Sequence, residues 1–243
     1  MPLSTRSWQL LPWVIASGDW QMALDDWLLE EVRGDRRPPT FRLFSWPEPT
    51  LSLGWHQASF STNWSCPIVR RPTGGRAVLH GGDLCYSLVT PAPADRDRRQ
   101  TYCLLSQFLR QAFQRLEQPL ITGSDRPDRT AIDCFARATV ADLRLVDGRK
   151  CIGSAQLWRD RTILQQGSIQ LHPPDCWPQV LGTTPPPVLD LPIATLSTTL
   201  VSSFADCYGL NLTDGSLTAA DWQAIDQRRS RFQINNPPSP LTQ

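Results

Sequence analysis

Cysteine and lysine are the residue types in this chain best suited to covalent group-transfer chemistry. A cysteine thiolate is a strong nucleophile, and a neighbouring cation or histidine favours that ionised form. Cys134 follows a polar, turn-rich stretch over residues 122–133, so we expect it to face a cleft. Cys151 is the alternative nucleophile, but it adjoins Lys150 in a predicted strand, where neighbouring side chains point to opposite faces. For either thiol, a buried structural role is the competing interpretation.

The single lysine of the chain is the second candidate for chemistry. Of the 24 basic residues, only Lys150 is lysine and all others are arginine. A fixed ammonium can stabilise a carbonyl oxygen that becomes an oxyanion, and arginine does not replace it where a compact charge is needed. Small residues follow at positions 153–155, which would let a ligand approach closely, and Gly153 is expected to interrupt the strand. The competing interpretation is a surface charge at a hairpin.

The segment from Arg70 to His80 could bind an acyl or phosphate-bearing ligand. It holds two adjacent glycines, whose backbone N–H groups can come close to a ligand, and three arginines that bring positive charge. An ordinary turn with solvated arginines is the alternative. His80 could orient a thiolate, or it could be a hydrogen-bonded structural histidine.

The remaining cysteines and the overall charge argue against several protein classes. Seven cysteines without a CxxC pair indicate reduced thiols in a cytosolic protein, with neither a zinc site nor a disulfide framework. Cys85 and Cys103 lie in apolar patterns where a cysteine is usually buried. A net charge of +1 argues against a broadly basic nucleic-acid binder, and no stretch is long and apolar enough to span a membrane. We also expect no secretory signal over residues 1–20.

Hydrophobic patterns predict a single α+β domain over residues 1–232 and a frayed, proline-rich tail over residues 233–243. We expect central mixed and antiparallel sheets flanked by helices. The predicted helices cover residues 17–33, 101–117, 194–209 and 218–232. The predicted strands cover residues 40–44, 51–55, 67–71, 77–80, 84–90, 143–145, 150–158 and 162–171.

Glycines mark the expected turns and breaks among these strands. The pair Gly81-Gly82 predicts a hairpin between the strands on either side, and Gly167 is expected to break the last strand. Neither a GxGxxG nor a Walker loop is present, so a standard nucleotide-binding fold is not supported.

Four motifs follow one another along the chain: MALD at residues 22–25, RRPTGGRAVLH at 70–80, GRKCIGSAQ at 148–156 and ILQQGSI at 163–169. In this combination the chain resembles the biotin/lipoate protein ligase and lipoyl/octanoyltransferase family. The resemblance implies the class II synthetase-like fold of the biotin and lipoate protein ligases.

Within that family the chain is most similar to the stand-alone octanoyltransferases in which a cysteine nucleophile precedes the lysine strand. Here Cys134-Phe135 precedes Gly148-Arg149-Lys150. The resemblance implies that Cys134 accepts an octanoyl group from octanoyl-acyl carrier protein. The group then passes to a lysine of a lipoyl domain, such as the glycine cleavage H protein. Lys150 would bind the acyl carbonyl, and neither a metal nor another cofactor would take part.

The resemblance also implies a set of substrate-binding residues. They would come from the glycine-rich loop, the strand after it and the meander: Arg71, Thr73, Gly74, Gly75, Arg76, Val78, His80, Gly153, Ser154, Ala155 and Gly167. An apolar slot for eight carbons would come from Val78, Leu79 and tryptophan side chains, with about 0.8 kcal/mol gained per buried methylene.

Two departures from the family pattern bear on the choice of reaction. ATP-dependent relatives usually carry an acidic residue directly after the histidine, whereas Gly81, Gly82 and Asp83 follow His80 here. Relatives often show histidine where this chain has Gln166. The alternatives to an octanoyltransferase are an ATP-dependent lipoate–protein ligase and a non-catalytic protein that binds acyl groups or lipoyl domains.

Overall fold

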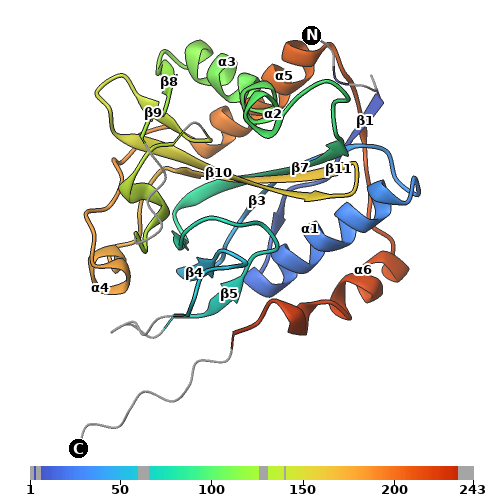
Figure 1. Cartoon of the computed structure of the whole chain (residues 1–243), viewed down its shortest axis with the longest axis horizontal. Helices are drawn as coiled ribbons and strands as arrows, with labels where there is room; N and C mark the ends of the chain where they lie inside the picture. Colours follow the sequence, from blue (N-terminus) through green and yellow to red (C-terminus); the bar gives the residue numbers. More distant parts are fainter. Residues whose placement is uncertain (1–2, 4–6, 60–65, 126–130, 140, 235–243) are drawn as a thin grey trace, which may run out of the picture.

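The computed structural model describes residues 3, 7–59, 66–125, 131–139 and 141–234. Its centre is a large mixed sheet with the strand order β12-β1-β3-β7-β11-β10-β9-β8, and β2 also pairs with β3 (Figure 1). The strands of this sheet are β1 (Ser7–Leu10), β2 (Val14–Ile15), β3 (Thr40–Ser45), β7 (Asp83–Pro91), β8 (Leu120–Thr122), β9 (Leu143–Leu145), β10 (Lys150–Arg159), β11 (Thr162–Gln170) and β12 (Asn211–Asp214).

A second, small sheet lies beside the large one in the order β5-β4-β6. Its strands are β4 (Thr50–Leu53), β5 (Ile68–Arg70) and β6 (Val78–His80). The short helix α4 (Trp177–Leu181) contacts β6, and together they enclose a separate apolar cluster. The glycine-rich loop between β5 and β6 therefore belongs to the small sheet but reaches toward the large one.

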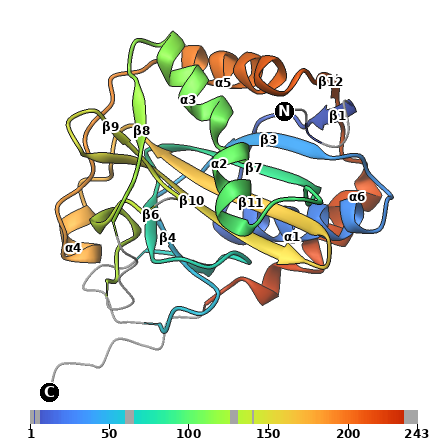
Figure 2. The ribbon, with the colours of Figure 1, turned by 45° about the horizontal axis from the view of Figure 1, so that its top comes forward.

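Helices cover both faces of the large sheet (Figures 1 and 2). On one face lie α1 (Gly18–Arg33), α6 (Ala219–Asp226) and the 3₁₀ turn η2 (Arg229–Arg231). On the other lie α2 (Arg98–Leu105), α3 (Gln107–Arg115) and α5 (Ile193–Tyr208), which share the largest apolar core with the sheet. The predicted α+β fold is confirmed. Among the described residues, no helix has the length and apolar character needed to cross a membrane.

The predicted helix over residues 101–117 is two helices, α2 and α3, separated at Ser106. It also begins earlier than predicted, at Arg98, within the stretch of prolines and charges. The reason is a capping box. The Gln100 N–H donates to the Asp97 carboxylate at 2.7 Å, and the Asp97 N–H donates to the Gln100 side-chain oxygen at 3.1 Å. Cys103, expected to be buried, lies on the exposed face of α2, whereas Cys85 is buried as predicted.

The hairpin predicted at Gly81-Gly82 is wrong. β6 pairs with β4 in the small sheet, and β7 pairs with β3 and β11 in the large sheet. The two glycines therefore carry the chain from one sheet to the other. Gly81 has a φ of +122°, and a Cβ on Gly82 would lie 1.7 Å from the carbonyl oxygen of His172.

The breaks predicted at Gly153 and Gly167 are also wrong, because β10 and β11 pair without interruption from Ile152–Ile169 to Arg159–Thr162. The strands β1, β2, β8 and β12 were not predicted, since they are short and gain their pairing from distant segments. At the other end of the chain, Gln233 pairs with β5, and residues 235–243 of the predicted tail lie outside the described residues.

Candidate active site

The structure brings Cys134 and Lys150 into direct contact. The Lys150 Nζ atom lies 3.5 Å from the Cys134 Sγ atom, although the two residues come from a 3₁₀ turn and from the start of β10. The same Nζ donates to the carbonyl oxygens of Cys134 at 2.6 Å and Arg137 at 3.0 Å. It also forms an ion pair with the Asp142 carboxylate at 3.0 Å. The ammonium therefore holds the turn that carries the thiol.

The backbone around Cys134 is fixed from two further directions. The Cys134 N–H donates to the carbonyl oxygen of Ala77 at 2.9 Å, directly after the glycine-rich loop. The buried Asp133 carboxylate accepts from the N–H of Phe135 at 2.7 Å and from the Thr183 hydroxyl at 2.5 Å. Asp133 thus caps the 3₁₀ turn η1 (Cys134–Ala136) and ties it to the segment after α4. A half-buried thiol is held in one position by these contacts.

Two buried cations lie near the sulfur. Burial alone would lower the pKa of the Lys150 ammonium, but the Cys134 sulfur and the Asp142 carboxylate raise it above its usual value. Burial lowers the pKa of the Arg71 guanidinium, and its interaction with the Cys134 sulfur opposes that change. Lys150 therefore stays charged at neutral pH and places a positive charge beside the sulfur.

Cys151 is placed on the opposite side of the sheet, as the alternation of strand side chains predicts. Its side chain is buried in the largest apolar core, and its Sγ lies 3.9 Å from the Leu143 carbonyl oxygen. Burial raises the pKa of the Cys151 thiol to about 12. A thiol that is buried and protonated is a poor nucleophile, so the geometry favours Cys134.

Cys134 lies where two cavities meet. A narrow, mostly apolar cavity extends inward, and among the predicted binding residues its walls include Arg71, Gly75, Val78, His80, Gly153, Ser154, Ala155 and Gly167. A wider cleft extends outward and includes Gly74, Gly75, Arg76, Ser154 and Ala155 together with Lys150. Thr73 lines neither cavity. Leu79, expected in the apolar slot, is part of the small-sheet core, since β6 turns Val78 and His80 toward the cavity instead.

Two glycines in the strands make room for this arrangement. A Cβ on Gly153 would lie 3.3 Å from the Cys134 Sγ and 3.5 Å from the Lys150 Cε. A Cβ on Gly167 would lie 2.1 Å from the ring of Tyr86, whose hydroxyl bonds the Ser154 hydroxyl at 2.9 Å. Close approach of side chains, rather than a break in the strand, explains why glycine occupies both positions.

The arginines of the glycine-rich loop bind the protein's own backbone. Arg71 donates to the carbonyl oxygens of Gly74, Arg76 and Ser52 at 2.7–3.0 Å. Arg70 donates to the carbonyl oxygen of Gln57 at 2.6 Å and to two others nearby. Arg70 lines neither cavity, and its guanidinium holds neighbouring loops together.

The lipoyl protein ligase A/B catalytic domain model matches residues 17–174. This chain belongs to the lipoyl protein ligase A/B catalytic domain family. The octanoyltransferase LipM of Carboxydothermus hydrogenoformans is 35% identical over 176 residues, which cover 68% of this chain and 65% of that relative. The match thus spans just under two thirds of that relative's length. The octanoyltransferase LipM of Kyrpidia tusciae is 28% identical, over 93% of this chain and 96% of its own.

Solved structures of the lipoyl protein ligase family share this fold. A lipoate-protein ligase A bound with ATP has a TM-score of 0.78 at 17% identity, over 93% of this chain and 95% of that chain. A bipartite lipoate protein ligase with its E2 lipoyl domain from Thermoplasma acidophilum has a TM-score of 0.71 at 17% identity, over 93% of each chain. At this identity the likeness extends to the fold alone.

A polar cluster forms part of the wall of the narrow cavity. The Asp83 Oδ2 atom accepts from His80 at 2.6 Å, from the Ser168 hydroxyl at 2.6 Å and from the Cys85 thiol at 3.0 Å. His80 also stacks on Trp46, with the ring centroids 4.0 Å apart. His80 therefore contacts Cys85 rather than Cys134. His80, Asp83 and Cys85 are close enough to hold a metal ion, but their polar atoms already satisfy one another.

Sequence reasoning missed three residues that complete the site. Asp133 and Asp142 position the turn and the ammonium, but their carboxylates lie in a stretch without regular spacing. Gln166 was noted only as a departure from the family pattern. Its side chain donates to the Asp25 carboxylate at 2.5 Å and accepts from the Thr73 hydroxyl at 2.7 Å, so it connects α1 to the glycine-rich loop.

Proposed function

We propose that this protein is an octanoyltransferase that moves an octanoyl group from acyl carrier protein to a lysine of a lipoyl domain. A thioester on Cys134 is the intermediate. The observation that carries the proposal is the 3.5 Å contact between the Cys134 sulfur and the Lys150 ammonium at the junction of an apolar cavity and an open cleft. The named activity of the LipM relatives supports the same reaction.

In the first step the Cys134 thiolate attacks the carbonyl carbon of the octanoyl thioester on the carrier. The carbonyl oxygen becomes an oxyanion, and the Lys150 ammonium beside the sulfur stabilises this developing charge. When the tetrahedral intermediate collapses, the bond between the carbonyl carbon and the carrier sulfur breaks. The carrier thiolate leaves and takes a proton from water, and the octanoyl group remains on Cys134.

In the second step the neutral amine of the acceptor lysine attacks the thioester carbon. The bond to the Cys134 sulfur breaks, and the thiolate returns to its place beside Lys150. The amine nitrogen loses a proton to water as the amide forms. The amide is more stable than the thioester, so the second step needs no nucleotide. The acceptor reaches the carbon through the open cleft, and a domain such as the glycine cleavage H protein is the kind of acceptor we propose.

The octanoyl chain would occupy the narrow cavity. Its walls include the apolar side chains of Met22, Phe44, Trp46 and Val78, and each buried methylene would contribute about 0.8 kcal/mol. His80, Cys85 and Ser168, which bond to Asp83, also line this cavity, and their polar atoms would favour a chain of limited length. The binding roles of Gly153, Ser154 and Ala155 would be to let the reacting carbonyl approach the sulfur closely.

An intact-mass experiment tests this function. The protein is incubated with octanoyl-acyl carrier protein, and we expect a mass gain of one octanoyl group. Cys134→Ala should abolish the gain, whereas Cys151→Ala, which removes the buried thiol, should retain it. The octanoylated protein should then transfer its group to a lipoyl domain. Octanoylation of the lipoyl domain that requires ATP and free octanoate would contradict the proposal and favour an ATP-dependent ligase, and no octanoylation of either protein under either condition would favour a non-catalytic binder.

A further inference from the structure

One edge of β10 has no partner strand beyond the reactive thiol among the described residues. β10 pairs with β9 only at Lys150 and Ile152, whereas its pairing with β11 on the other edge continues to Arg159. Within the described residues, no strand pairs with the first edge from Gly153 onward. On this edge the Ser154 N–H donates to the Asp142 carboxylate at 3.4 Å and the Gln156 N–H donates to the Tyr102 hydroxyl at 2.7 Å. The backbone carbonyl oxygens on the same edge are the groups to which an extended, amide-containing chain can donate hydrogen bonds.

Two clefts follow one another along this edge. The cleft at the thiol is lined by Ser154, Ala155 and Gln156 of β10. The next cleft is lined by Gln156 and the three residues after it, up to Arg159. Both clefts share the walls His56, Gly74 and Gln156, so they form one continuous path.

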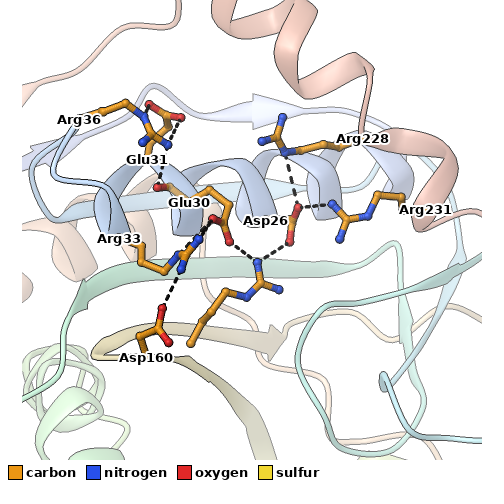
Figure 3. Close-up of polar contacts among 9 residues, drawn as sticks. Asp26, Glu30, Glu31, Arg33, Arg36, Asp160, Arg228 and Arg231 are labelled. Atoms are coloured by element: carbon orange, nitrogen blue, oxygen red, sulfur yellow. Dashed lines mark hydrogen bonds and ion pairs between the residues drawn. The ribbon is translucent and has the colours of Figure 1, made fainter.

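Arginines and carboxylates form a cluster of ion pairs around α1 (Figure 3), and two of the arginines, Arg159 and Arg231, line the far end of this path. The buried Asp26 carboxylate of α1 faces three guanidinium groups, with Arg231 at 3.0 Å, Arg159 at 3.5 Å and Arg228 at 3.6 Å. The Glu30 carboxylate also forms an ion pair with Arg159. The two carboxylates cannot neutralise all three cations, so positive charge remains in the cleft that Arg159 and Arg231 line.

Arg98 adds a further cation from the other face of the sheet. It lines the same cleft from the start of α2, and its guanidinium lies 5.5 Å from the centre of the Trp158 ring. The structure gives Arg98 no carboxylate partner among the described residues. Arg98 and Arg159 thus approach the end of the β10 edge from opposite sides.

We propose that the edge of β10 binds the phosphopantetheine arm of the donor carrier protein and that its phosphate lies between Arg98 and Arg159. This inference rests on the proposed function, because the arm is what carries the octanoyl thioester. The two amide N–H groups of the arm would donate to backbone carbonyl oxygens on this edge of β10, and the phosphate would meet the surplus positive charge. Arginine is well suited to this role, since its planar guanidinium can donate two hydrogen bonds to one phosphate.

The length of β10 agrees with the length of the arm. From Gly153, which adjoins the Cys134 sulfur, to Trp158 beneath Arg98 there are five strand steps, or about 17 Å. An extended phosphopantetheine arm has about thirteen bonds from sulfur to phosphorus, or roughly 15 Å. A donor with its thioester at Cys134 would therefore place its phosphate beside Arg98.

Two small donors that differ by one phosphate test this site. The rate of Cys134 octanoylation is measured by intact mass with S-octanoyl-4′-phosphopantetheine and with S-octanoyl-pantetheine. We expect the phosphorylated donor to have a kcat/KM at least about tenfold higher. In Arg98→Gln, whose exposed side chain is not needed for folding, this ratio should fall toward one.

Arg99→Gln is the matched control, because Arg99 lies on the same helix, is also exposed and does not line the cleft. The ratio should stay high in this variant. Equal rates for the two donors in the native protein, or an unchanged ratio in Arg98→Gln, would overturn the phosphate site while leaving the transferase intact. No octanoylation by either donor or by octanoyl-acyl carrier protein would instead contradict the proposed function itself.

Discussion

At the scale of single residues, the site depends on how one ammonium is shared. Lys150 donates to two carbonyl oxygens, pairs with Asp142 and lies beside the Cys134 sulfur, all within 3.5 Å. The same group therefore orders the turn and supplies the charge for the reaction. Lys150 therefore has both a structural and a chemical role. The two roles can be separated only if Asp142, its ion-pair partner, is changed together with Lys150.

Lys150→Met should destabilise the fold and abolish the chemistry together. It leaves the Asp142 carboxylate buried without a cation, which we expect to lower the free energy of unfolding by about 3–5 kcal/mol. Octanoylation of Cys134 should slow by at least about 100-fold. Adding Asp142→Asn removes the unpaired charge, so the double variant should regain part of the stability in a urea titration but none of the rate. Recovery of the rate along with stability would show that Lys150 acts only through the fold.

At the scale of elements, β10 connects the reactive thiol and ammonium to the proposed phosphate site. It begins at Lys150, passes the Cys134 sulfur at Gly153 and ends at Arg159. The sequence motif located this strand and its lysine, and the alternation rule placed Cys151 on the opposite side. The motif could not show that Gly153 lies inside a continuous strand. Glycine is needed there because the Cys134 sulfur, from another segment of the chain, lies close to this position.

Gly153→Ala should separate catalysis from folding at this element. The new Cβ would lie 3.3 Å from the Cys134 Sγ, a tight contact that would push the sulfur away from the ammonium. We expect the octanoylation rate to fall by about tenfold or more, since reacting groups tolerate little misplacement. The midpoint of thermal unfolding should change little.

Gly167→Ala is the contrasting variant for that experiment. Its Cβ would lie 2.1 Å from the buried Tyr86 ring, so this change should cost about 1–3 kcal/mol of stability by overpacking. Gly153→Ala could instead destabilise the fold as much as Gly167→Ala and leave the octanoylation rate unchanged. The short distance between position 153 and the Cys134 sulfur would then play no part in catalysis.

At the scale of the whole molecule, the fold joins segments that no local pattern connects. The parallel pair of β1 and β12 links residues 7–10 with residues 211–214, and the Cys134 turn is tied to Ala77 by a backbone hydrogen bond. Helices with strong periodicity, such as α1, were predicted almost to the residue. Short strands, and the carboxylates at Asp133 and Asp142, depend on contacts between distant segments, so the sequence alone could not place them.

Several buried thiols and phenols should make the whole molecule sensitive to high pH. Burial raises the pKa of Cys151 to about 12 and that of Tyr86 to about 12. A group whose pKa is raised in the folded state contributes stability that is present below its unfolded pKa and is lost as the pH rises toward its folded pKa. For Cys151 this window runs from about 8.5 to about 12. The free energy of unfolding should therefore decline steadily above about pH 9.

Cys151→Ala tests this dependence. Each titrating group contributes at most about 1.4 kcal/mol per pH unit, so removal of the Cys151 thiol should make the decline between pH 9 and 11 shallower by up to that amount. Urea titrations at several pH values measure the slope. Cys103→Ala is the control, since the Cys103 side chain is exposed and its removal should leave the slope unchanged. If the native protein and Cys151→Ala gave equal slopes, the buried thiol would not be a source of the alkaline instability, and the phenols such as Tyr86 would have to account for it.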